Sequence, residues 1–362
     1  MSCRNHLIRY CIDEYLSKDV IDIILEYVHE FEGHIISSFR SLYPKYLKAL
    51  DRGYFVWYDS DKILYIGSSK TKPIELESFL DDIYINNGNI YTFPGNIIIF
   101  TRNDILHIYR LINLNNLKFN YFSLKSNSDI TTAIQISETK YCIGMDDGII
   151  QIFDIETASF EYNLIEQTRE IFQLLVLPEN LLASSSTNGD ICIWNLNTKA
   201  IYKKFKFIEE EDYDFSDIQL TYIGNTRIML FDGLNIEIWD YKVGKRLNSR
   251  LLKDFSESII YDTNIILFGK DDILFLDCNT LETVKNFKVI NRSETFAEIK
   301  DIKILSGNHL AILSSDPNLI IMDLTTGKII QIHEIENEIS CLTKLTNYEY
   351  VYASGNFIYV RN

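Results

Sequence analysis

The chain has 362 residues, of which 46% are hydrophobic and 24% are charged, the proportions of an ordinary globular protein. Its formal net charge of −16 argues against a nucleic-acid backbone or an anionic membrane surface as the main partner. No apolar run reaches the roughly 20 residues of a membrane span, and the first residues lack the apolar core of a signal peptide, so we expect a cytoplasmic protein.

The first predicted element is an amphipathic helix within residues 12–31. Ser17 is placed to cap its N-terminus, and Asp19 follows in the first turn. Apolar residues then recur every three or four positions, at Val20, Ile23, Ile24, Tyr27, Val28 and Phe31. This spacing predicts one apolar face along the helix. Residues 1–32 are therefore expected to form a short helical segment in front of the rest of the chain.

The sequence YLSKDVIDIILEYV in this segment resembles the first helix of an F-box, with Ser17 where the usual pattern has a proline. F-box helices insert an apolar face into a groove on the Skp-type adaptor of cullin-based ubiquitin ligases. The resemblance implies that Val20, Ile23, Ile24, Tyr27 and Phe31 bind such an adaptor. The alternative is that the helix only packs against the following domain.

Beyond residue 33 the pattern is that of β-structure, and one hairpin recurs along the chain. Its second strand ends in an apolar residue followed by Asp or Asn, at Asp154, Asn195, Asp240, Asp277 and Asp323. Isoleucine, leucine or phenylalanine lies two and four places earlier, as in Ile150/Ile152 and Ile191/Ile193, and threonine lies three places later in four of the five cases. An Asp or Asn side chain can accept hydrogen bonds from the amides of the turn that follows, which lets the chain reverse.

Weaker matches to the same pattern place Gly67 and Arg110 upstream, and Asn362 downstream, at the position of the strand-ending Asp or Asn. Positions counted from this residue are called frame positions. The eight positions are about 42 residues apart on average, within the 40–45 residue period of four-stranded propeller blades. With the endings ICIWNLNTKAI and IEIWDYKVGK, residues 34–362 resemble the WD-repeat β-propeller family. The resemblance implies an all-β fold of four-stranded blades over residues 33–362. Eight frame positions predict eight blades, and seven is the alternative.

The last repeat supplies three strand-like runs and then the chain stops. An unpaired sheet edge would expose a row of backbone N–H and C=O groups. The segment Gly33–Phe39, GHIISSF, lies ahead of the first repeat and is predicted to pair with the last one, as WD-repeat propellers usually close.

An acidic run occupies the long connection between two repeats. It begins Glu209, Glu210, Glu211, Asp212 and Tyr213. Such a run is typical of a solvated loop because its charges repel one another. The functional alternative is a docking site for a basic partner segment, with Tyr213 and Phe215 as anchors.

The sequence carries no catalytic signature. It has no nucleophile elbow, phosphate-binding glycine loop or dinucleotide fingerprint, and its six histidines are scattered. Acidic pairs such as Asp146-Asp147 fall at predicted turns, where they favour chain reversal. The six cysteines are far apart, and four of them lie in or beside strand-like runs, as expected of small buried residues. We therefore predict no enzyme activity, no cofactor and no metal.

These features together predict an interaction scaffold. A short F-box-like start joined to WD repeats resembles proteins of large DNA viruses. The resemblance implies a substrate receptor for a cullin-type ubiquitin ligase, with the helix on the adaptor and the propeller on an unknown target. The alternative is a WD-repeat scaffold without a ubiquitin role.

Overall fold

A computed structural model describes the chain in segments. These are residues 35–40, 45–50, 54–58, 63–68, 71–78, 89–113, 118–207, 218–253, 255–269, 272–288, 299–305, 308–314, 318–335, 339–344, 350–354 and 357–361. Every regular element in these segments is a β-strand. The strands form eight four-stranded sheets, and the chain divides into two compact units.

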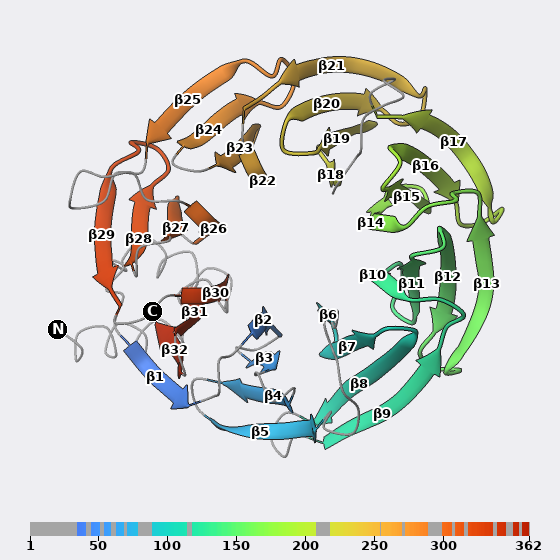
Figure 1. The fold of residues 1–362 in the computed structure, drawn as a ribbon, viewed down its shortest axis with the longest axis horizontal. Helices are drawn as coiled ribbons and strands as arrows, with labels where there is room; N and C mark the ends of the chain where they lie inside the picture. Colours follow the sequence, from blue (N-terminus) through green and yellow to red (C-terminus); the bar gives the residue numbers. More distant parts are fainter. Residues whose placement is uncertain are drawn as a thin grey trace, which may run out of the picture. The chain divides into compact units, whose positions relative to one another are not determined.

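The second unit, Asp81–Ile299, contains five of the sheets. In chain order they are β6 (Asn89–Phe93), β7 (Ile97–Arg102), β8 (Ile105–Asn113) and β9 (Lys118–Lys125); β10 (Ile130–Gln135), β11 (Lys140–Met145), β12 (Ile149–Asp154) and β13 (Ser159–Ile165); β14 (Ile171–Leu177), β15 (Leu181–Ser186), β16 (Asp190–Asn195) and β17 (Ala200–Lys206); β18 (Gln219–Tyr222), β19 (Arg227–Phe231), β20 (Asn235–Asp240) and β21 (Lys245–Leu251); and β22 (Phe255–Tyr261), β23 (Asn264–Gly269), β24 (Asp272–Asp277) and β25 (Thr283–Lys288). Each sheet is an antiparallel meander, with its first strand on the inner side and its last on the outer side (Figure 1).

The first unit, Met1–Leu80 with Lys300–Asn362, contains the other three sheets. Their strands are β2 (Lys45–Ala49), β3 (Tyr54–Tyr58), β4 (Ile63–Ser68) and β5 (Thr71–Ser78); β26 (Ile299–Ile304), β27 (His309–Ser314), β28 (Asn318–Asp323) and β29 (Ile329–Glu334); and β30 (Ile339–Lys344), β31 (Tyr350–Ser354) and β32 (Phe357–Arg361) with β1 (Ile35–Arg40). Strand β1 pairs antiparallel with β32, from Ile35 opposite Arg361 to Arg40 opposite Phe357. This register confirms the predicted pairing of the N-terminal strand with the last repeat.

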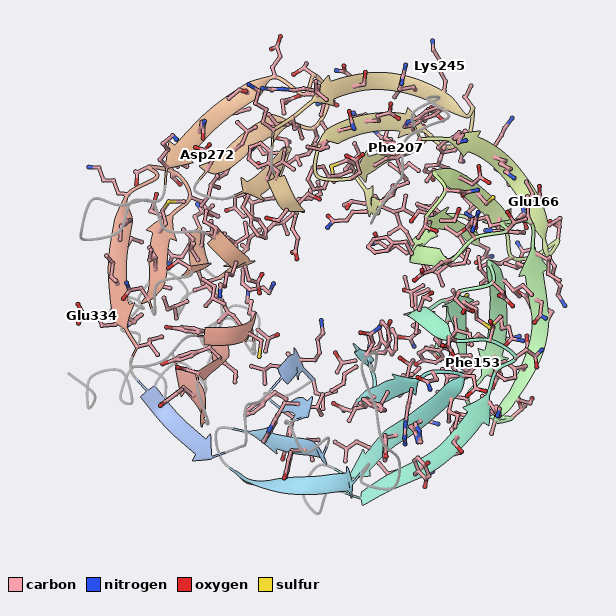
Figure 2. The ribbon with its side chains drawn as sticks, viewed as in Figure 1. Phe153, Glu166, Phe207, Lys245, Asp272 and Glu334 are labelled. Atoms are coloured by element: carbon pink, nitrogen blue, oxygen red, sulfur yellow. The ribbon has the colours of Figure 1, made fainter. Side chains whose placement is uncertain are left out.

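Neighbouring sheets share their hydrophobic cores. One cluster joins Cys142, Ile150 and Ile152 of the β10–β13 sheet to residues of the next sheet, among them Leu174, Leu182 and Trp194. A second joins Ile191, Ile193 and Phe207 to residues of the β18–β21 sheet, including Ile228 and Leu230. Figure 2 shows Phe153 and Phe207 among the side chains packed between sheets, and both are fully buried. Each of these two cores is formed by two sheets, so burial of their apolar surface requires a neighbouring sheet.

The repeated Asp or Asn at the strand end has the predicted role. The side-chain Oδ1 of each residue accepts hydrogen bonds from the backbone amides two and three positions later. The residues are Asp154, Asn195, Asp240, Asp277 and Asp323. In Asp277 and Asp323 the threonine hydroxyl three places later also donates to Oδ1. Five turns are therefore fixed by the same local contact.

These contacts predict a loss of stability in acid. Amides of Thr280 and Asn279 lower the pKa of Asp277 below its ordinary 3.8, and amides of Thr326 and Thr325 lower that of Asp323. Because the folded pKa lies below the unfolded one, this stabilisation is complete above pH 3.8 and is lost as pH falls through the folded value. The double variant Asp277→Asn/Asp323→Asn keeps an acceptor at each turn, as Asn195 does. Its urea-unfolding midpoint should therefore fall less between pH 5 and pH 2 than that of the unmodified protein. An equal fall of the midpoint with pH in both proteins would show that these two carboxylates do not cause the loss of stability in acid.

Candidate functional site

The residues predicted to contact partners lie outside the described part of the chain. These are the helix face of Val20, Ile23, Ile24, Tyr27 and Phe31, and the acidic residues Glu209, Glu210, Glu211, Asp212 and Tyr213. Their roles remain predictions. The candidate site that the structure does describe is the polar cluster around the β15–β16 turn.

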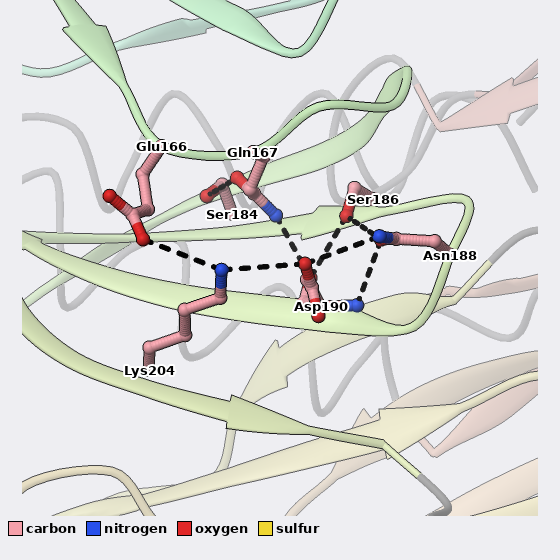
Figure 3. Close-up of polar contacts among 7 residues, drawn as sticks. All are labelled: Glu166, Gln167, Ser184, Ser186, Asn188, Asp190 and Lys204. Carbon is pink, nitrogen blue, oxygen red and sulfur yellow. Dashed lines mark hydrogen bonds and ion pairs between the residues drawn. The ribbon is translucent and has the colours of Figure 1, made fainter. Parts of the chain in front are cut away.

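The outer part of this cluster is an ion triplet. Lys204, on β17, places its Nζ 3.5 Å from Glu166 Oε1 and 3.5 Å from Asp190 Oδ2 (Figure 3). The Nδ2 of Asn188 donates to Asp190 Oδ2 at 3.2 Å, and the hydroxyl of Ser186 donates to Asn188 Oδ1 at 2.7 Å. Three strands and the loop after β13 thus meet at one turn.

The inner part is a buried chain of hydrogen bonds. Trp194 Nε1 donates to Ser184 Oγ at 2.9 Å, and Ser184 Oγ donates to Gln167 Oε1 at 2.5 Å. Gln167 Nε2 then donates to the backbone oxygen of Asp190 at 2.9 Å. Trp194, Ser184 and Gln167 are all buried, so each polar atom here requires the partner that it has.

The electrostatics of the cluster favour a structural role. Burial by itself would lower the pKa of Lys204, but the carboxylates of Asp190 and Glu166 outweigh that effect and raise it. The amine therefore stays charged and is no nucleophile at neutral pH. The Ser184 proton is donated to an amide oxygen rather than to a base, so the hydroxyl is not activated either. The cluster binds the loop after β13 to β15, β16 and β17.

The next sheet contains a buried carboxylate that also joins polar side chains of different strands. Glu237, on β20, is 3% exposed in its side chain and accepts from Arg246 Nη1 at 2.6 Å. Its other oxygen accepts from Trp239 Nε1 at 2.7 Å. The ring of Trp239 stacks on Phe205 of β17, with centroids 4.4 Å apart. Strand β20 therefore carries both an ion pair to β21 and an aromatic contact to β17.

Further polar links join the inner strands. The side-chain amide of Gln173, on β14, donates to Leu220 O at 3.1 Å and accepts from Leu220 N at 2.7 Å, which ties β14 to β18. Thr131 Oγ1, on β10, donates to Ile171 O at 2.5 Å. Tyr91 OH, on β6, donates to Thr131 O at 3.1 Å. The inner strands of successive sheets are thus connected by side chains as well as by core packing.

The other sites considered from the sequence show no assembled chemistry. Asp146 and Asp147 form the β11–β12 turn, where Asp146 accepts from Ser128 and Asp147 accepts from Ile149 N at 3.0 Å. Burial raises the pKa of the Cys192 thiol to about 12, and it also raises the pKa of Cys142. Within the described segments, no three His, Cys, Asp or Glu side chains lie close enough to hold a metal ion.

Two residues of these clusters were missed in the sequence. Gln167 has no counterpart in the repeat pattern that would mark it. Glu237 did carry a signal, because the same frame position is occupied by Cys192, Leu274 and Ile320 in other repeats. The Asp154 repeat has Gln151 there, so none of the four other repeats carries a charge at this position. A buried carboxylate in its place requires a cation, and Arg246 lies nine residues later.

No helix among the described residues has the length and apolar character to span a membrane. Comparison with known proteins found no matching family model and no matching curated protein. Among solved structures, the chain resembles the computationally designed Ika8 protein at 17% identity and a TM-score of 0.67, over 91% of this chain and 98% of that one. It also resembles BamB from Moraxella catarrhalis at 15% identity and 0.67, over 91% and 97%, and Saccharomyces cerevisiae Sqt1 at 11% identity and 0.69, over 91% and 99%. At these identities the likeness shows the fold alone, an all-β propeller.

Proposed function

We propose that this chain is a protein-protein interaction scaffold built on a propeller whose blades are the eight four-stranded sheets. The propeller fold supports this role, because such folds typically bind protein partners. The observation that carries it is that the polar side chains of the described clusters are hydrogen-bonded to one another. In the part of the chain that the structure describes, the buried polar clusters join strands to one another, as the contacts of Ser184, Gln167 and Glu237 show. The proposal assigns the chain no catalytic activity.

The more specific proposal is that the scaffold acts in the cytoplasm as a substrate receptor for a cullin-type ubiquitin ligase. Its support is the F-box-like sequence of the first 32 residues, with the apolar positions Val20, Ile23, Ile24, Tyr27 and Phe31. In this role the helix binds a Skp-type adaptor and the propeller holds the target. The second candidate is a scaffold without a ubiquitin role, which the propeller fold supports equally well.

Capture on an immobilised Skp-type adaptor tests the specific proposal. The full chain should be retained, and Ile24→Asp should abolish retention because it places a charge on the face that would enter the groove. Glu26→Lys lies on the polar side of the predicted helix and should be retained as the unmodified chain is. Failure of the unmodified chain to bind, or equal capture of Ile24→Asp, would favour the scaffold without a ubiquitin role.

A further inference from the structure

The outermost strand β21 presents aliphatic side chains to solvent. Leu251 is 77% exposed, Leu247 is 48% exposed, and Leu234, in the preceding β19–β20 turn, is 43% exposed. The turn is tied to the end of β21 by a hydrogen bond from Leu252 N to Leu234 O of 2.6 Å. Single exposed leucines are common, but three on one strand and its adjoining turn form a local apolar surface.

The segments that contain β21 and the nearby β17 are basic in a strongly acidic protein. Residues 199–207 and residues 241–253, which include β17 and β21, contain nine Lys and Arg and no Asp or Glu. In the whole chain acidic residues outnumber basic ones by 51 to 35. Strand β17 lies against β20 and the turn that leads into β21, because Phe205 stacks on Trp239 and because a Cβ at Gly244 would lie 3.7 Å from Lys203 Cδ.

Part of this positive charge has no carboxylate partner among the residues that the structure describes. Lys204, Lys242 and Arg246 have carboxylate partners. Lys245 and Lys253, at either end of β21, are exposed and pair with no carboxylate in the described part of the chain. Lys245 lies at the outer side of its sheet (Figure 2). The leucines of β21 are therefore flanked by two cations that an acidic partner could pair with.

Strand β21 also has a free edge. It is the last strand in the order β18-β19-β20-β21, and no described strand pairs with its outer side. An outer edge offers backbone N–H and C=O groups to an added strand, while alternate side chains of that strand supply specificity.

The positive charge of β21 determines which kind of partner can pair with its free edge. A second copy paired through its own β21 would place Lys and Arg opposite Lys and Arg, which is destabilising. A nucleic acid would meet exposed leucines rather than aromatic stacking platforms, and the net charge of −16 would oppose its backbone. An acidic polypeptide with apolar residues satisfies both the leucines and the lysines.

We propose that the outer strand β21, with Leu234, Lys245, Leu247, Leu251 and Lys253, is a docking site for an acidic, extended segment of a partner protein. The segment adds a strand to the free edge, its carboxylates pair with the two lysines, and its apolar residues cover the leucines. This proposal rests on the scaffold function proposed above and names the chemistry of one partner.

Fluorescence anisotropy with a short labelled peptide in which glutamate alternates with valine tests the site on the full chain. Lys245→Glu/Lys253→Glu and Leu251→Ser should each weaken binding by roughly tenfold or more, which corresponds to about 1.4 kcal/mol. Lys328→Glu and Val284→Ser are exposed positions elsewhere and should bind as the unmodified chain does. Circular dichroism of each variant checks that it remains folded, and raising the salt concentration should weaken binding of the acidic peptide.

Three results would overturn the proposal. These are no binding of the acidic peptide to the unmodified chain, unchanged binding by both β21 variants, or equal binding of a lysine-valine peptide or of a thymidine oligonucleotide. Unchanged binding by both β21 variants would place the acidic peptide elsewhere and leave the scaffold role standing. Adaptor capture uses residues 1–32 instead, so its outcome is separate from that of β21.

Discussion

Gly148→Ala is expected to lower the free energy of unfolding by about 2–5 kcal/mol. Gly148 has a φ of 85°, in the left-handed region, where an alanine is strained. A Cβ at this position would also clash with the backbone oxygen of Gln167 and lie 2.9 Å from that of Arg169. Both oxygens belong to the loop after β13, so the substitution would force the β11–β12 turn away from the next sheet.

Gly95→Ala is the matched control for this prediction. Gly95 has a φ of 80°, and a Cβ there would have no heavy atom within 4 Å. Its cost should be that of backbone strain alone, about 1 kcal/mol. Urea unfolding followed by tryptophan fluorescence measures both variants. Equal midpoints for Gly148→Ala and Gly95→Ala would show that the contact with the loop after β13 contributes nothing.

Arg246→Ala is expected to lower the free energy of unfolding by about 2–3 kcal/mol, because it leaves a buried carboxylate without its cation. The side chain of Glu237 is 3% exposed, whereas that of Arg246 is 49% exposed. The exposed guanidinium is partly screened by solvent, so the expected loss is smaller than the roughly 3–5 kcal/mol of a fully buried pair.

A double variant separates the cost of the unpaired charge from the worth of the ion pair. Glu237→Leu/Arg246→Ala should recover most of the stability lost in Arg246→Ala, since Leu274 occupies the same frame position of the next sheet. The Trp239 indole would then donate to water, because it is only half buried. A double variant as unstable as Arg246→Ala would mean that the hydrogen bonds that Glu237 accepts from Trp239 and Arg246, rather than the pairing of its charge, stabilise this sheet.

The local parts of the fold could be predicted from the sequence because their contacts span only a few residues. Asp154 and its counterparts bond amides two and three positions away, so the repeat of Asp or Asn and Thr marks the turns directly. The alternation of Ile191 and Ile193 likewise indicated the buried face of β16, which packs against the next sheet. The N-terminal strand was identifiable because the last repeat lacked one strand.

The contacts between sheets were decided by the tertiary structure alone. Gly148 approaches Gln167, and Trp239 stacks on Phe205, only because separate sheets pack against each other. The β21 surface is of the same kind, because the sequence does not distinguish the exposed Leu251 from the adjacent Leu252, which is buried. Periodicity gives the two faces of a strand, but the neighbouring sheet determines which residues are covered, because burial depends on what packs against them.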